Sequence, residues 1–466
     1  MSDMLINNGT LVTVDKDRRI IKEGAIFIKG DRIADIGKSE VLAAKYPSAE
    51  RIDATGFLVL PGFVDAHIHL TQMLARGLTD DIDGVQVKWS WDRVFPWEAV
   101  LSEEDVYYSA MLCCAELIKT GTTCFADPGG YCMDSVAKAV GETGLRGIIA
   151  VAAVDQSNEE WPLPDGFAGK PSTDRAVKET LELIDKWHRK FDDRLRVWTS
   201  LRVEPNVSER LILEMAKIAE QYDVGIQNHC SVSPGRVNFV KKSTGHTPVA
   251  YYHSLGVLDD RWLLTHLGHI TDEELPLIRD YNVNVCHNPG AALHGGNGAI
   301  TKGKFPEMLE MNVNISLGCD SSAADNSLDM TREMYHVATV HKEWRSDGTL
   351  ISPEQALEMA TINGAKALKW DREIGSLEVG KKADIILMNA KKPNWVPMYD
   401  FSIVPNLVYA GDGQDVETVL IDGKVVMRDR KLVGMDEQKI IEESQRRAEK
   451  LLTKLPYTLE PRWPVL

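Results

Sequence analysis

Two histidines, His67 and His69, stand one residue apart at the end of the apolar stretch PGFVDAHIHL, residues 61–70. On a β-strand the side chains alternate between the two faces, so these two imidazoles point to the same side. Two adjacent imidazoles can bind one metal ion if the rest of the chain supplies further ligands. The spacing therefore predicts part of a metal site.

Three further residues of suitable type also stand at the ends of expected strands. His229 ends VGIQNH, His266 ends RWLLTH and Asp320 ends VNISLGCD. One such histidine is more often a hydrogen-bonded structural residue, but a set at strand ends is a stronger signal. In a closed parallel barrel those ends carry the active site, and imidazoles with a carboxylate suit Zn²⁺ or Fe²⁺.

The elements that must position these residues follow a clear rhythm. Short β-rich segments fill the first 60 residues, apolar strands then alternate with amphipathic helices in seven or eight units, and strands return from about 373. This order predicts an α/β fold: a (β/α)8 barrel with a flanking β-sandwich built from both chain ends. We expect four parts: 1–60 and 373–435 in the sandwich, 61–372 in the barrel, and 436–466 as a C-terminal helix and tail.

Composition narrows the class of protein. The 466-residue chain has a net charge of −16, which disfavours nucleic acid and anionic membranes as partners. Its seven cysteines form no CxxC pattern, as expected of free thiols in a reducing compartment. The sequence shows neither a signal peptide nor a long apolar run, so we expect a cytoplasmic protein that acts on a small organic substrate.

Several motifs together resemble the amidohydrolase superfamily. They are PGFVDAHIH, LGCDSSAADNSLDM, ALEMATINGAKAL and GSLEVGKKADIILM, together with the strand-end residues His229 and His266. The similar branch holds cytosine and guanine deaminases, adenosylhomocysteine deaminase and atrazine chlorohydrolase. The resemblance spans about residues 5–450 and implies the same barrel with its flanking sandwich. Because relatives are commonly dimers or tetramers, it also implies a homo-oligomer.

The resemblance implies roles for the strand-end residues. One divalent metal ion, zinc or iron, would be bound by His67, His69, His229 and Asp320. Asp320 would also be catalytic, taking a proton from water and passing it to the leaving group. His266 would be the second catalytic residue, which polarises the substrate or the hydroxide. The fourth strand, in RVWTSLRVEPN, lacks the lysine that bridges two metals in binuclear relatives, which favours one ion.

One departure from the family pattern bears on the reaction. Deaminases of this branch carry a glutamate three residues after the fifth-strand histidine, where this chain has Val232. Valine cannot protonate a ring nitrogen, so the sequence favours hydrolysis of an amide, urea or carbamate bond, as in the similar phenylurea and thiocarbamate hydrolases. The alternative is an aminohydrolase or dechlorinase of an N-heterocycle such as a triazine, purine or pterin. A non-catalytic scaffold is a minor third possibility, since all the ligand positions are filled.

Candidate substrate contacts come from loops after the strands. Tryptophans after the first strand could form an aromatic wall or pack over the barrel rim. An arginine and a glutamate after the fourth strand could recognise substrate or form a surface ion pair. Two further histidines could line the pocket or be solvated. The candidates are Trp89, Trp91, Arg202, Glu204, His269 and His287.

Overall fold

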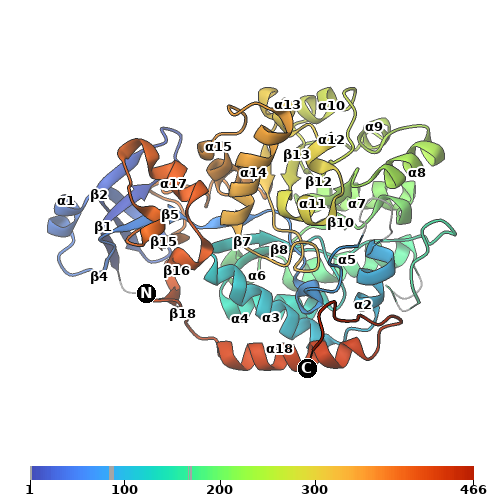
Figure 1. Ribbon diagram of the computed structural model, residues 1–466, viewed down its shortest axis with the longest axis horizontal. Helices are drawn as coiled ribbons and strands as arrows, with labels where there is room; N and C mark the ends of the chain where they lie inside the picture. The colour runs from blue at the N-terminus through green and yellow to red at the C-terminus, as the bar shows by residue number, and fades with distance from the viewer. Residues whose placement is uncertain (1–2, 83–88, 166, 168–170, 466) are drawn as a thin grey trace.

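The protein, described by a computed structural model, consists of a barrel and a flanking sheet (Figure 1). The structure describes residues 3–82, 89–165, 167 and 171–465. Among these, no helix is long and apolar enough to cross a lipid bilayer. The predicted α/β class, a barrel with a sandwich made from both chain ends, is confirmed.

Eight parallel strand positions form the barrel. Its strands are β6 (Phe63–Asp65), β7 (Thr122–Ala126), β8 (Arg146–Ile149), β9 (Leu195–Val197), β10 (Thr199–Leu201), β11 (Ile226–Cys230), β12 (Trp262–His266), β13 (Asn284–His287) and β14 (Ile315–Leu317). Strands β9 and β10 are separated only by Trp198 and fill one position. All hydrogen-bonded neighbours run parallel, in the order β6-β7-β8-β9 and β10-β11-β12-β13-β14.

The barrel closes where its first and last strands meet. Ile68 forms a parallel bridge with Asp320, and the Asp320 amide donates to the His67 carbonyl at 2.8 Å. Between β14 and Asp320, a Cβ on Gly318 would lie 2.8 Å from the His67 backbone. Only glycine lets the two chains approach this closely, so the residue is required for closure.

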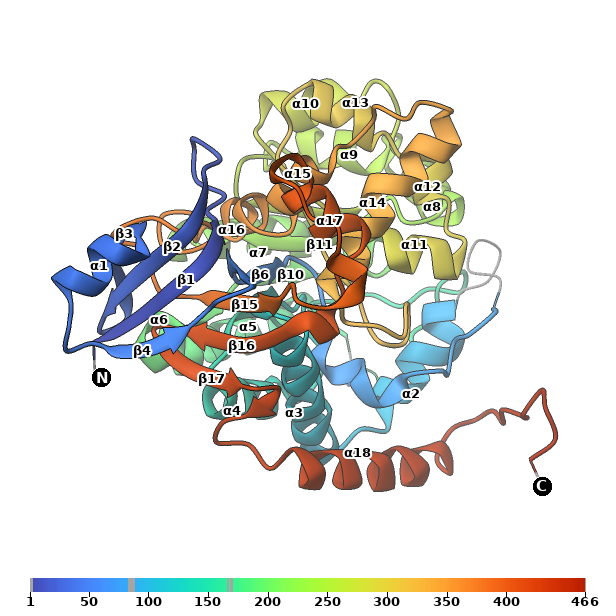
Figure 2. The same ribbon diagram turned by 60° about the vertical axis from the view of Figure 1, so that its left-hand side comes forward.

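Helices surround the strands on the outside of the barrel (Figures 1 and 2). The longer ones are α3 (Glu103–Lys119), α4 (Met133–Thr143), α5 (Thr173–Trp187), α7 (Glu209–Tyr222), α8 (Pro234–Thr244) and α14 (Met330–Arg345). The shorter ones are α2 (Phe95–Ala99), α6 (Lys190–Asp193), α9 (Pro248–Ser254), α10 (Leu275–Asp280), α11 (Pro289–Gly295), α12 (Ala299–Lys302), α13 (Phe305–Glu310), α15 (Pro353–Met359) and α16 (Ile362–Ala367). Helix α3 begins at a capping box in which Ser102 and Asp105 satisfy each other's backbone N–H groups.

The flanking sheet joins both ends of the chain. Its strands are β1 (Met4–Val12), β2 (Ile20–Lys29), β3 (Arg32–Lys38), β4 (Glu50–Asp53), β5 (Phe57–Pro61), β15 (Ile385–Asn389), β16 (Val416–Ile421), β17 (Lys424–Arg428) and β18 (Lys431–Leu432). Antiparallel pairing of β5 with β15 connects the two halves. Helix α1 (Ser39–Lys45) packs on this sheet, whereas helix α17 (Ile403–Tyr409) packs on α14 and α15 of the barrel. Ile6, Val59 and Leu387 are buried in a core of the sheet's own.

A buried cluster of charges fixes the sheet against the barrel. Arg146, at the start of β8, lies 3.0 Å through its Nε from Asp384 and also pairs with Asp422, and all three are buried. Charges taken out of water need partners and hydrogen bonds, which this arrangement supplies. The cluster therefore fixes how the two parts meet.

The C-terminal helix α18 (Glu437–Leu452) packs on the barrel beside α3 and lies within the part, 436–466, expected to form a C-terminal helix and tail (Figure 2). Arg447 Nη1 lies 2.9 Å from Asp105 Oδ1, and both residues are buried. Ser444 donates its hydroxyl to the Tyr108 carbonyl at 3.4 Å.

Candidate metal centre and pocket

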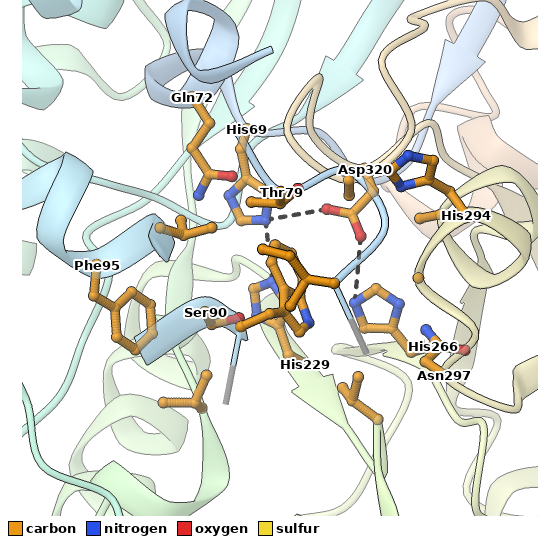
Figure 3. A pocket seen from close by; sticks show the side chains of 18 of the residues that line it. His69, Gln72, Thr79, Ser90, Phe95, His229, His266, His294, Asn297 and Asp320 are labelled. Carbon is orange, nitrogen blue, oxygen red and sulfur yellow. Dashed lines mark hydrogen bonds and ion pairs between the residues drawn. The ribbon is translucent and has the colours of Figure 1, made fainter. Parts of the chain in front are cut away.

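The carboxyl ends of the barrel strands bring all five predicted residues together. Figure 3 shows four of them, His69, His229, His266 and Asp320. We refer to these five, His67, His69, His229, His266 and Asp320, as the floor. His69 Nε2 lies 3.1 Å from His229 Nε2. Asp320 Oδ1 lies 3.6 Å from His69 Nε2, and Asp320 Oδ2 lies 3.8 Å from His266 Nε2.

The imidazoles of the floor are held neutral. Burial lowers the pKa values of His67, His69 and His229 well below 6.5, and nearby positive charge, including that of Arg202, lowers them further. Burial lowers the pKa of His266 to about 3. Neutral imidazoles keep a lone pair available, which is the form that binds metal ions.

The floor fits one divalent cation. Ligand atoms of His67, His69 and His229 lie within 4.8 Å of one another, and so do those of His67, His266 and Asp320. The buried Nε2 of His67 has no hydrogen-bond partner in the described part of the chain. A buried polar atom without a partner is costly, and a metal ion at the centre of these residues would remove that cost. Imidazole and carboxylate donors suit zinc and similar ions.

The backbone is unusual at two floor residues. His266 has φ = 79° and Asp320 has φ = 64°, values that side chains other than glycine rarely adopt. Each residue directly follows or ends an apolar strand, where surrounding packing and ladder bonds can impose the conformation. Such strain gathers at functional sites because it aims a side chain in a required direction.

A cavity lies over the floor at the mouth of the barrel. Its sides, which we refer to as the wall, carry aromatic and aliphatic groups between polar ones. The wall residues are Gln72, Thr79, Ile82, Trp89, Ser90, Val94, Phe95, Arg202, Val203, Val232, Arg236, Ala291, His294, Gly295, Asn297 and Ala324. Residues 83–88 of the loop after the first strand lie outside the described residues. A flat ring would find an aromatic surface at Trp89 and Phe95.

A buried ion pair stands beside His69. Arg202 Nη2 donates to Glu98 Oε1 at 2.8 Å, and Gln72 Nε2 donates to the same oxygen at 2.7 Å. Arg202 Nη1 donates to the Gly129 carbonyl and lies 3.4 Å from His69 Nδ1. A positive charge is thus fixed behind a candidate metal ligand.

A second buried ion pair stands beside His229. Arg236, in the first turn of α8, donates from Nε to Glu204 Oε2 at 2.7 Å, and its Nη2 contacts the same oxygen. The Ser231 amide donates to Glu204 Oε1 at 2.7 Å. Arg236 Nη2 also donates to the His229 carbonyl at 2.8 Å. The pair therefore braces the end of β11.

Of the predicted substrate contacts, Trp89 and Arg202 line the cavity. The other four predictions are not matched by the wall. Trp91 is buried and packs on Trp161, with ring centroids 4.7 Å apart. Glu204 is engaged by Arg236 rather than paired with Arg202 at the surface, because both residues are buried and each has its own partner.

The two loop histidines face other partners. The Nε2 of His269 lies 2.8 Å from the Asn297 carbonyl, so His269 lies behind a wall residue. The ring of His287 stacks on Phe305, with centroids 3.6 Å apart, and its Nε2 lies 3.1 Å from His341 Nε2. Neither histidine is among the residues that line the cavity.

Three buried polar residues around the pocket, Gln72, Glu98 and Arg236, were not identified from the sequence. Gln72 and Glu98 are brought to Arg202 only by tertiary packing. The Ser-Pro-Gly-Arg sequence at 233–236 does mark a helix start, with Ser233 as the N-cap. That signal could have placed Arg236 in the turn after the fifth strand.

The chain matches the model of the amidohydrolase family over residues 58–426. It is 32% identical over 454 residues to a 5-methylthioadenosine/S-adenosylhomocysteine deaminase from Thermoanaerobacter pseudethanolicus, covering 97% of this chain and 100% of the relative. It is 34% identical over 454 residues to a 5'-deoxyadenosine deaminase from Methanosarcina acetivorans, covering 97% and 99%.

A solved structure is also similar over nearly its full length. It is a zinc-bound adenosine deaminase from Xanthomonas campestris, 25% identical in sequence, with a TM-score of 0.88. The similarity covers 97% of this chain and 99% of that one. The relatives thus match the barrel and the flanking sheet together.

Proposed function

The chain belongs to the amidohydrolase family, and its similar relatives act on carbon–nitrogen bonds other than peptide bonds. We propose that this protein is an aminohydrolase. The reaction would replace the amino group of a small N-heterocycle by oxygen and release ammonia. Deaminase relatives at 32% and 34% identity support this alternative better than the amide, urea or carbamate hydrolysis that the sequence favoured. The observation that carries the proposal is the neutral histidine floor with Asp320, lying under an aromatic wall.

The cofactor would be one divalent ion, and zinc is the ion bound in the similar Xanthomonas campestris deaminase. In this chain His67, His69, His229 and Asp320 would hold it. When bound, such an ion supplies Lewis acidity that makes water a nucleophile near neutral pH.

The chain's own floor residues would handle the proton. Asp320 would accept a proton from the attacking water and then deliver it to the departing amino nitrogen. His266, neutral and 3.8 Å from Asp320 Oδ2, would orient that carboxylate and hydrogen-bond to the oxygen that adds to the ring.

The wall would position the substrate. Trp89 and Phe95 offer flat apolar surface for a heterocyclic ring, and Arg202 is a fixed cation at the edge of the cavity. Water would be excluded from the ring faces while polar atoms at the ring edge meet the floor.

The test is a product assay after metal quantification. Zinc-loaded protein is incubated with aminopurines, aminopterins, amino-triazines, ureas, carbamates and anilides, while ammonia and organic amine are measured separately. Ammonia from a heterocycle supports the proposal. Ammonia from none of the heterocycles contradicts it.

A second candidate function rests on Val232. This residue lines the cavity, so the position offers no carboxyl group to protonate a ring nitrogen. A carbonyl substrate has no such need, because its oxygen can be polarised directly. Organic amine released without ammonia would favour this hydrolysis of an amide, urea or carbamate.

Other expectations stay predictions. Iron as the metal, a homo-oligomeric state and a cytoplasmic location each await direct measurement. Bound metal at about one ion per chain would exclude the scaffold alternative.

A further inference from the structure

The proposed reaction creates a charge that the pocket must stabilise. When water's oxygen adds to the carbon that bears the amino group, the electron pair of the ring C=N bond moves to the ring nitrogen. That nitrogen becomes negative until the pair returns, the C=N bond re-forms and ammonia leaves with the proton carried by Asp320. A hydrogen-bond donor fixed beside the ring nitrogen lowers the barrier, because it meets the charge as it develops.

Arg236 is a donor with unused capacity at this point. Its Nε and Nη2 donate to Glu204 and to the His229 carbonyl, whereas its Nη1 forms no hydrogen bond with the residues that the structure describes. The residue is buried and lines the cavity. A guanidinium held by two of its nitrogens presents the third in a fixed direction, because the group is planar.

The position of Arg236 places this donor next to the reacting groups. Its contact with the His229 carbonyl puts the guanidinium at the end of β11, beside a candidate metal ligand. Both residues line the same cavity. Val232 lines the same cavity, so no carboxylate at that position competes for the free donor.

We propose that Arg236 hydrogen-bonds through Nη1 to the ring nitrogen next to the carbon that loses ammonia. The inference rests on the proposed function and names the substrate feature that the pocket recognises, a ring nitrogen that becomes negative. An arginine does not release its proton, so it stabilises the charge without a proton transfer. The protons of the reaction stay with water, Asp320 and the leaving ammonia.

The other buried arginine is less suited to this role. Arg202 uses Nη1 for the Gly129 carbonyl and Nη2 for Glu98, so both terminal nitrogens are engaged. It lies beside His69, whereas Arg236 lies beside the carbonyl of His229. The two arginines thus approach the floor from different strands.

The first experiment compares Arg236→Lys with the unchanged protein. Lysine keeps a positive charge opposite Glu204 but cannot present a third fixed donor. With an amino-triazine or aminopyrimidine series of increasing electron withdrawal, we expect kcat to fall about 100-fold on the least activated member, as for loss of one charge-stabilising donor. The fall in kcat should become smaller as the ring substituents withdraw more electrons, because the ring then stabilises the negative charge itself. A merely structural role would lower all members equally.

Arg210→Lys is the matched control, because Arg210 forms an exposed ion pair with Asp174. It should change neither kcat nor its dependence on the substituent. Metal content and Tm, measured for both variants, separate loss of fold from loss of the donor.

The second experiment does not require turnover. Cyanurate, a negatively charged ring, is titrated into both proteins by calorimetry. We expect about 10-fold weaker binding to Arg236→Lys, because a charge-assisted hydrogen bond is lost. Arg236-dependent binding without ammonia release from any compound would leave the ring recognition standing and reject the aminohydrolase function. Equal binding by both proteins, or no binding by the unchanged protein, overturns the role of Arg236.

Discussion

The floor and the wall of the cavity are built in different ways. Every floor residue stands at the end of a barrel strand or in the residues directly following one. The wall draws its residues from loops, from the first turns of helices and from buried arginines held by distant glutamates. We therefore expect the proposed catalytic residues to be positioned by the strand ends, which the barrel fixes. We expect substrate recognition to depend on the surrounding segments, which can change without disturbing the strands.

The largest effect should follow from Asp320→Asn. The amide cannot accept and return a proton and is a poorer ligand, so we expect at least about a 1,000-fold loss of kcat. Steady-state kinetics and metal analysis measure it, with the exposed Asp174→Asn as control. Near-normal turnover by the Asp320→Asn variant would contradict the role of the floor.

His266→Asn should lose about 100-fold to 1,000-fold in kcat while it keeps the bound metal. The side chain lies in the floor but is the one histidine there not assigned as a ligand. Metal content per chain, measured beside kcat, separates the two roles. Loss of the metal together with activity would make His266 a ligand instead.

The variants Trp89→Ala and Trp91→Ala should distinguish a residue that contacts substrate from one that packs in the interior. Trp89 lines the cavity, so its loss should raise KM about 10-fold with a smaller change in kcat. Trp91 is buried against Trp161, so its loss should lower the free energy of unfolding by about 3–5 kcal/mol. Substrate titrations and urea unfolding of both variants measure the contrast. Equal effects on KM would show that the wall extends to Trp91.

The smallest effect concerns His341, which lies in neither region. Burial lowers its pKa to about 4, against about 6.5 in an unfolded chain. Between these values the unfolded state binds more protons, so the protein loses stability as the pH falls from 6.5 towards 4. His341→Gln should reduce that loss by about 1–3 kcal/mol, as urea midpoints at pH 5 and pH 7.5 would record. An unchanged pH dependence would mean that His341 does not titrate on unfolding.

The same contrast explains what the sequence could predict. Strand ends follow from apolar runs, so the barrel, the sheet from both chain ends and the convergence of His67, His69 and Asp320 were accessible. The partner of Arg202 could not be predicted from the sequence, because Glu98 is 104 residues away and reaches Arg202 only through tertiary packing. The contacts of His287 were equally inaccessible, since a strand-end position does not reveal that its ring stacks on Phe305.

The meeting of the first and last barrel strands has a mechanical consequence. His67 and His69 follow the first strand, and Asp320 follows the last, directly at the Ile68–Asp320 bridge. An ion held by these residues would link the first strand to the last. Metal binding would therefore stabilise the pairing of these two strands, and the pairing would strengthen metal binding. Chelation should then raise amide exchange first at 66–68 and 317–320, where the first and last strands meet, while the strands that carry no ligand stay protected.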